Sequence, residues 1–269
     1  MAWSSIKTEG IVLRVDALRE VDRRYRILTP GLGKIEVIGR GAQKRLAKLA
    51  PHLEPFSVLD LEVIQGRRRM TVISVESLKS FRGIASSLEM RLLAATSLSL
   101  LDKATHELGG GDALYPELFA WLSFLNTQPY MRSARSALLL GGYLLRVLSS
   151  LGYDVELLHC ISCKDRIESD HYSWHAGQGG LVCRMCTTKS PETWFAARDV
   201  SDDLVKLMRF ARDSDYSDLL RPALHGDIME RFVRRVQDLM MYHLPGNFET
   251  PFWTAILPDL TLDLEPVNV

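Results

Sequence analysis

The four cysteines of the chain form two pairs, Cys160-x2-Cys163 and Cys183-x2-Cys186, with 19 residues between the pairs. Each pair offers two thiolates on one tight turn, and two such turns facing each other complete the tetrahedral set that a structural Zn²⁺ prefers. A closed shell of four thiolates leaves no open position for water. The spacing therefore predicts one zinc ion with a structural role, held by Cys160, Cys163, Cys183 and Cys186.

Alternatives to this zinc site remain open at the level of sequence. The cysteines could instead form a redox pair or stay without a ligand. One of three nearby histidines, His159, His171 or His175, could replace a thiolate. Disulfides are not expected, because the N-terminus does not resemble an export signal and a cytoplasmic location follows. The apolar stretches fall short of the roughly 20 residues that a membrane-spanning helix needs.

A second group of side chains that could bind a ligand is cationic and gathers near the N-terminus. The net charge of the chain is zero, yet residues 1–80 hold 15 Lys and Arg against 9 Asp and Glu. Such an asymmetry favours a polyanionic partner, and cations that neutralise phosphates give affinity with little sequence preference. A solvated basic face is the alternative interpretation. The predicted DNA contacts are Arg23, Arg24, Lys34, Arg40, Lys44, Arg45, Lys48, Arg67, Arg68 and Arg69.

Short strands should position these cations. Val, Ile and Thr are enriched between residues 7 and 80, and the pattern predicts strands near 8–15, 24–29, 34–40, 56–64 and 70–77. Pro30 to Gly33 should turn the second strand into the third. Five short strands suit a small closed barrel of the oligonucleotide-binding (OB) type. In such barrels nucleic acid crosses the second and third strands, between the loop that joins the first two strands and the loop that joins the last two. Arg67 to Arg69 fall in the latter loop, between the predicted strands 56–64 and 70–77.

Helices should follow the barrel, because apolar residues then recur every three or four positions. We predict helices over about 84–108, from Pro116 to about 125, and over 131–151, with two more after Ser201 and from Asp227. The predicted fold is thus α+β and multidomain. It has an OB-type barrel (1–80), an all-α domain (81–155 and 191–250), an inserted zinc-ribbon-like module with a hairpin (156–190), and a C-terminal tail (251–269).

Enzyme motifs are mostly missing. There is no phosphate-binding GxxxxGK[ST] sequence, and Glu36 stands where a dinucleotide-binding fingerprint needs glycine. The His52-x-Glu54 pair superficially fits a zinc deaminase, but neither CxxC follows a proline and the second pair would close the metal site. A binding protein without catalytic residues is the favoured interpretation. A zinc-ribbon regulator of transcription or translation and a nucleic-acid-modifying enzyme are the alternatives.

The order and spacing of several motifs resemble the bacterial RecO recombination-mediator family. They are residues 8–13 (TEGIVL), Glu20-x-Asp22-Arg23, Thr29, Gly33-Lys34, Arg40-Gly41-Ala42, Leu151-Gly152-Tyr153, the CxxC pairs and residues 179–183 (GGLVC). The resemblance spans nearly the whole chain. Gln43 and Leu46 depart from the basic and small polar residues expected after the third strand.

The resemblance to the RecO family implies a function in DNA repair and recombination. It implies binding of single- and double-stranded DNA, annealing of complementary strands, and a cytoplasmic, nucleoid-associated location. The implied partners are RecR, the acidic C-terminal tail of single-strand-binding protein and, indirectly, RecA recombinase. Some family members lack the cysteines, so a chemical role for zinc is not implied.

Overall fold

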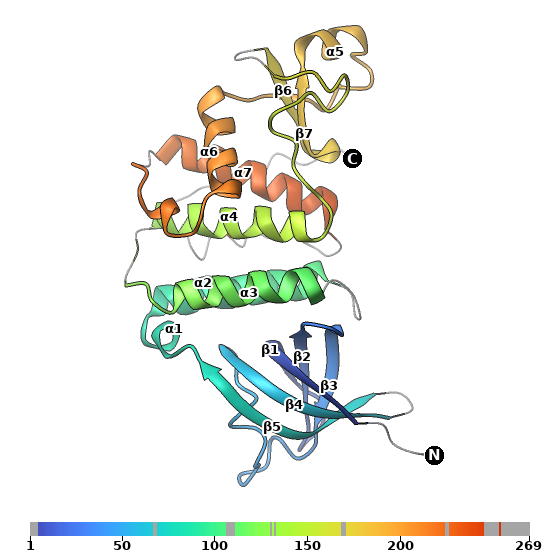
Figure 1. Ribbon diagram of the computed structural model, residues 1–269, viewed down its shortest axis with the longest axis vertical. Helices are drawn as coiled ribbons and strands as arrows, with labels where there is room; N and C mark the ends of the chain where they lie inside the picture. Colours follow the sequence, from blue (N-terminus) through green and yellow to red (C-terminus); the bar gives the residue numbers. More distant parts are fainter. Residues whose placement is uncertain are drawn as a thin grey trace. The chain divides into compact units, whose positions relative to one another are not determined.

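Two compact units make up the chain, residues 1–130 and 131–269 (Figure 1). The computed structural model describes residues 5–66, 69–105, 111–129, 131, 133–167, 171–223, 226–244 and 253. Within these ranges no helix combines the length and the apolar character that crossing a membrane requires. Helices α1 to α3 belong to the same unit as the strands that precede them.

The first unit begins with a closed barrel of five strands in the order β1-β2-β3-β5-β4. The strands are β1 (Ser5–Ala17), β2 (Arg23–Thr29), β3 (Gly33–Gly39), β4 (Ser57–Gln65) and β5 (Met70–Ser80). Strands β1 and β4 pair antiparallel and close the barrel, while β3 and β5 pair in parallel at Val37 and Met70. This is the predicted OB-type barrel, and the predicted β2–β3 hairpin is confirmed by pairing from Thr29↔Gly33 to Arg23↔Gly39.

The barrel encloses an apolar core made by alternate residues of its strands. In β4, Leu59, Leu61 and Val63 are buried, whereas Asp60 between them is exposed. This period of two is what places one face of a strand inside a barrel. Residues of β1, β2 and β3 complete the core, and Leu53 from the long connection between β3 and β4 is also fully buried. The outward faces of β2 and β3 are therefore fixed by register, and they carry Arg24, Arg26, Lys34 and Glu36.

Three helices follow the barrel in the same unit: α1 (Arg82–Ser86), α2 (Leu88–Ala104) and α3 (Gly111–Leu125). The prediction of one helix over 84–108 is wrong. The chain leaves helical geometry at Ser87, whose hydroxyl accepts a hydrogen bond from the backbone N–H of Met90 and caps α2.

Helix α3 starts five residues earlier than predicted and contains Pro116. A Cβ at Gly111 would lie 2.4 Å from the carbonyl oxygen of Thr29 and 2.7 Å from the Cα of Gly33. The glycine therefore permits a close approach of α3 to the β2–β3 turn rather than breaking the chain there.

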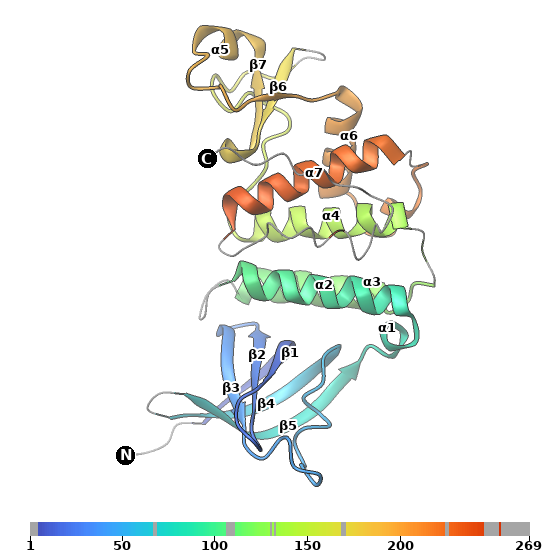
Figure 2. The same cartoon turned by 180° about the vertical axis from the view of Figure 1, so that it is seen from behind.

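The second unit combines three longer helices with a small sheet. Helices α4 (Ser133–Ser150) and α7 (Gly226–His243) pack against each other, and α6 (Asp202–Asp213) contacts both (Figures 1 and 2). Gly141 of α4 leaves room for the ring of Phe232, whose Cε1 would lie 2.2 Å from a Cβ there. Ser201 caps α6 as predicted, by accepting a hydrogen bond from the N–H of Leu204. A short 3-10 turn, η2 (Asp218–Leu220), lies between α6 and α7.

The small sheet has the order β7-β6-β8 and carries the cysteine region. Its elements are β6 (Tyr172–His175), the 3-10 turn η1 (Ala176–Gln178), β7 (Gly180–Cys183), the short helix α5 (Arg184–Lys189) and β8 (Arg198–Asp199). The β6–β7 hairpin confirms the predicted one, while β8 was not predicted.

Two arginines of α6 hold the entry to the cysteine region. The side chain of Arg209 donates two hydrogen bonds to the carbonyl oxygen of Leu157, and Arg212 donates one to that of Val155 at 2.5 Å. At the end of α7, His243 lies 2.8 Å from the carbonyl oxygen of Ala176 in η1. Helices α6 and α7 therefore support the sheet that positions the cysteines. Of the tail after Pro251, only Trp253 lies within the described residues, and it is buried.

Candidate metal centre and nucleic-acid surface

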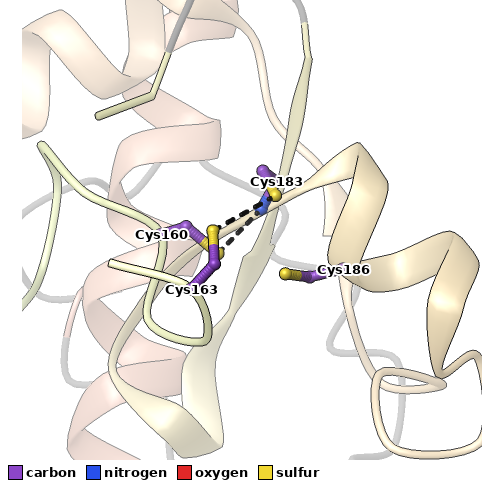
Figure 3. Close-up of side chains that lie close together, drawn as sticks. All are labelled: Cys160, Cys163, Cys183 and Cys186. Atoms are coloured by element: carbon purple, nitrogen blue, oxygen red, sulfur yellow. Dashed lines mark hydrogen bonds between the residues drawn. The ribbon is translucent and has the colours of Figure 1, made fainter. Parts of the chain in front are cut away.

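The structure brings all four cysteines together, as Figure 3 shows. Their Sγ atoms lie within 4.8 Å of one another, and the Sγ atoms of Cys163 and Cys183 are 3.8 Å apart. Zn–S bonds of about 2.3 Å in a tetrahedron place neighbouring sulfurs at about 3.8 Å, whereas a disulfide requires about 2 Å. None of the four forms a disulfide. The residues thus fit a four-thiolate metal ion.

Two different local structures deliver the two pairs of thiolates. Cys160 and Cys163 lie on a turn in which the N–H of Lys164 donates to the carbonyl of Cys160, and the N–H of Cys160 donates to the carbonyl of Asp165. Lys164 adopts a left-handed conformation with φ of 66°, which reverses the chain after the second cysteine. Cys183 ends β7 and Cys186 lies in the first turn of α5. A turn and a strand-to-helix junction therefore converge on one point.

Backbone hydrogen bonds favour the thiolate at Cys160. Burial acts to raise the pKa of this thiol, but N–H groups of Cys183, Cys163 and Ser162 outweigh burial and lower the pKa to about 7. The N–H of Cys183 lies 3.3 Å from the Cys160 Sγ. Burial instead raises the pKa of Cys183. The lowered pKa favours the thiolate form of Cys160, and metal binding requires a deprotonated thiol.

Two of the three histidines considered as substitute ligands have other environments. The Nδ1 of His175 accepts a hydrogen bond from the N–H of Gln178, and its ring meets that of Trp194 edge to face. His159 lies 3.6 Å from a carboxylate oxygen of Glu156. In the described part of the chain, the metal-ligand cluster at this site contains cysteines alone.

The predicted cations of β2 are paired with carboxylates. Arg24 lies 3.5 Å from Glu36 on the neighbouring strand, and Arg23 lies 3.9 Å from Glu54. Arg26, which was not predicted as a DNA contact, lies 2.7 Å from Asp102 of α2 and 3.8 Å from Asp16 of β1. The positive charge of β2 is thus largely offset by carboxylates of the protein itself.

Lys34 is buried, which contradicts the expectation of an exposed cation. Its side chain is only 8% exposed, and its ammonium group contacts the carbonyl oxygens of Asp102 and Thr105 and the carboxylate of Asp102, 3.3 Å away. These three acceptors match the three N–H donors of an ammonium group. They lie at the C-terminal end of α2, where a cation is favoured by the helix dipole. Lys34 therefore joins the barrel to α2 and does not face a DNA backbone.

The predicted cations in the β3–β4 connection are exposed. Arg40, Lys44, Arg45 and Lys48 have no ion pair with any residue that the structure describes. Gln43 holds this connection to the β1–β2 loop, because its side-chain amide donates to the carbonyl oxygens of Arg19 and Asp22. The departure from the family pattern at Gln43 thus has a structural role.

Of the three arginines predicted in the β4–β5 loop, Arg69 is exposed, while Arg67 and Arg68 lie outside the described residues. The carbonyl of Arg69 accepts a hydrogen bond from the N–H of Gly66 and closes the turn. Met70, the next residue, pairs with Val37 of β3. Arg69 therefore stands at the edge of β3, on the side opposite β2.

Comparison with known proteins assigns the chain to a family. Residues 1–81 match the family described as "Recombination protein O N terminal", and residues 86–249 match "Recombination protein O C terminal". The chain belongs to the RecO family. Two proteins named DNA repair protein RecO are similar over most of their length. The one from Dehalococcoides mccartyi strain BAV1 is 24% identical over 92% of this chain and 94% of its own. The one from Alkaliphilus metalliredigens is 28% identical over 89% and 94%.

The two RecO matches follow the architecture closely. The first covers the barrel, which is the OB-fold domain of RecO proteins, and the second covers α2 to α7 with the four cysteines. Sequence reasoning missed Arg26 and Asp102 in this RecO chain. The alternation of β2 could have placed Arg26 beside Arg24 on the outer face, whereas nothing in the sequence pairs Asp102 with β3 across 68 residues.

Proposed function

We propose that this RecO protein is a DNA repair and recombination mediator that binds DNA without sequence preference and anneals complementary strands. Family membership over both halves of the chain carries the proposal. The closed OB barrel with exposed cations supports it, because cationic barrels of this kind bind nucleic acid through phosphates. Tyr25 of β2 is fully buried and is therefore not available to stack on a base, which favours charge over stacking.

The proposed DNA path runs over the β3–β4 connection rather than along the middle of the β2–β3 face. Arg40, Lys44, Arg45 and Lys48 are exposed there, next to the β1–β2 loop that Gln43 holds in place. Arg67 to Arg69 extend the path at the β4–β5 loop. Arg23 and Arg24 contribute after exchanging their carboxylate partners for phosphates.

The proposed partners are RecR, the acidic tail of single-strand-binding protein and, indirectly, RecA, which the mediator loads onto coated DNA. The metal is proposed to be a single Zn²⁺ held by Cys160, Cys163, Cys183 and Cys186, because four thiolates in a tetrahedral arrangement are the usual structural zinc site. Four protein ligands leave no position for a reacting water, so the ion would stabilise the module. We propose no catalytic residue.

The decisive experiment is annealing of complementary strands coated with cognate single-strand-binding protein. A mediator should accelerate annealing of the coated strands, and RecR should then allow RecA to displace the coat. The reaction should need no nucleotide hydrolysis by the RecO protein itself. No acceleration on coated strands, with normal binding to bare DNA, would contradict the mediator function.

The same protein preparation discriminates a sequence-specific regulator. A regulator should bind one duplex sequence at least about a thousandfold more tightly than random DNA. The mediator should bind different sequences with similar affinity and lose affinity steeply as salt increases. Titrations with several unrelated duplexes and single strands measure both properties.

A further inference from the structure

The β3–β4 connection exposes one large apolar side chain, that of Leu46. Its exposed fraction is 89%, the highest among the large apolar residues that the structure describes. Covering a leucine is favourable in proportion to the apolar area removed from water, so a side chain this exposed gains most when a ligand covers it. A single exposed leucine is common on protein surfaces, and the residues around Leu46 therefore decide whether it marks a contact.

The charges around Leu46 are all positive. Residues 40–53 contain no Asp or Glu and four cations, Arg40, Lys44, Arg45 and Lys48. These cations are exposed and have no ion pair with any residue that the structure describes. The connection therefore presents an apolar side chain among cations, and a nucleic acid strand has the matching combination of apolar base faces and phosphates.

The backbone on both sides of Leu46 is anchored to the barrel. Ala42 belongs to the buried core of the barrel, and Leu49 packs against the same core. Between these two anchors, the N–H of Ala47 donates a hydrogen bond to the carbonyl of Lys44 at 3.0 Å and closes a turn around Leu46. A side chain on an ordered turn loses less conformational entropy when a ligand covers it than one on an unstructured loop.

We propose that Leu46 packs against an unstacked base of a single strand whose phosphates are bound by the neighbouring cations. Proteins that unstack DNA insert apolar side chains such as Leu, Phe and Met beside the bases. In the described part of the barrel, Tyr25 is buried and Phe56 is half-buried, so neither ring is as accessible to a base as Leu46. The proposal rests on the proposed DNA path and adds to it a contact with bases instead of phosphates.

An anionic lipid surface would attract the same cations. One leucine offers little apolar area for insertion into a bilayer, and the connection is not the amphipathic helix that binds membrane interfaces. A single base, in contrast, is small enough for one leucine side chain to cover much of its face. Nucleic acid is therefore the favoured ligand of Leu46.

Fluorescence anisotropy of the full chain with two labelled strands tests the proposal: an oligothymidylate, and an abasic strand with the same number of phosphates. Leu46→Ser should weaken binding to the oligothymidylate about five- to tenfold. It should leave binding to the abasic strand and both salt slopes unchanged, because no phosphate contact is lost. Lys44→Ala should instead weaken binding to both strands and lower the slope by about 0.7. Leu88→Ser, at a 60% exposed position of α2, is the matched control and should bind both strands as the parent does.

A second variant adds the opposite change at the same position. Leu46→Trp should tighten binding to the oligothymidylate a few-fold, because an indole ring stacks on a base, and should leave binding to the abasic strand unchanged. Both variants alter an exposed side chain and should melt as the parent does.

The outcomes separate this proposal from the proposed function. If Leu46→Ser binds the oligothymidylate as the parent does, or loses affinity for both strands equally, the base contact is overturned while DNA binding stands. Loss of binding to phosphatidylserine vesicles in Leu46→Ser, with unchanged affinity for the oligothymidylate, would make the residue a lipid contact and also overturn it. A parent that binds neither strand would contradict the proposed function itself.

Discussion

The cysteine module and the barrel differ in how the structure arranges the site residues that the sequence predicts. All four predicted ligands converge within 4.8 Å in the module. In the barrel, the predicted cations divide into exposed residues of the β3–β4 connection and residues of the β2–β3 face that have carboxylate partners. Ligand spacing in a CxxC turn is fixed by a few neighbouring residues, whereas the role of a cation depends on distant partners.

Lys34 and Lys44 show the contrast within one barrel. Both are lysines in the basic N-terminal region, yet Lys34 is buried against the end of α2 and Lys44 is exposed. Burial makes Lys34 part of the fold, because its charge is compensated only in the native arrangement. Exposure leaves Lys44 available to a phosphate. Basic composition therefore identifies a candidate surface without saying which of its members bind DNA.

The largest expected effect comes from removing one thiolate of the module. Cys183→Ser should lower the zinc content from one equivalent to less than about half, because three thiolates leave the shell incomplete. The β6–β7 hairpin and α5 should lose their order, with a lower melting temperature. Metal analysis and thermal melting measure both. One full equivalent of zinc with unchanged melting would refute the four-cysteine site. The control is Ser162→Ala, in the turn that carries Cys160 and Cys163.

The next effect concerns the buried cation. Lys34→Met should lower the free energy of unfolding by about 3 kcal/mol, because Asp102 would keep a buried charge with Arg26 as its remaining partner. Lys44→Met, at an exposed position, should change it by less than about 0.5 kcal/mol. Urea unfolding gives both values. Adding Asp102→Asn should cost less in the Lys34→Met background than in the parent, and equal costs would exclude the pair as a structural link.

The sequence predicted the strands and helices of the fold more completely than the roles of the charged surface residues. The period of two in β4 and the turn at Pro30 to Gly33 gave the barrel strands, because these signals are local. The break at Ser87 escaped the helix prediction, since the apolar spacing of three and four continues across it. The next helix was predicted to begin at Pro116, whereas α3 begins at Gly111. The glycine allows close contact with the β2–β3 turn, and that contact depends on tertiary packing.

The third prediction tests the exposed group of cations. Replacing Arg40, Lys44, Arg45 and Lys48 with alanine should weaken binding to all single-stranded sequences and lower the slope of log affinity against log salt by up to about 2.8, at roughly 0.7 per contact. The fold should persist, because exposed cations contribute little to stability. The control replaces four exposed cations outside the barrel, Lys103, Lys206, Arg221 and Arg231. Equal losses in both variants would show general charge attraction instead of a DNA path.

A smaller effect is expected at the β4–β5 loop. Replacing Arg67, Arg68 and Arg69 with alanine should lower the same slope by up to about 2 for single strands. Zinc content should not change, because the cysteines belong to the other unit. Titration of labelled oligonucleotides at several salt concentrations provides the measurement. A triple variant with the affinity and slope of the parent would leave the β3–β4 connection as the main contact.

The smallest expected effect tests whether Arg24, which is paired with a carboxylate, can contact DNA. Arg24 lies 3.5 Å from Glu36, and both side chains are partly exposed, so a phosphate could replace the carboxylate. Glu36→Gln should release Arg24, raise affinity for single strands a few-fold at low salt and steepen the salt slope by up to about 0.7. The control Glu62→Gln removes one charge from β4 at a distance from Arg24 along the barrel and measures general repulsion alone. Arg24→Ala combined with Glu36→Gln should abolish the gain. If Glu36→Gln and Glu62→Gln raise affinity equally, the β2–β3 face lies off the DNA path, and the paired cations of the barrel serve the fold alone.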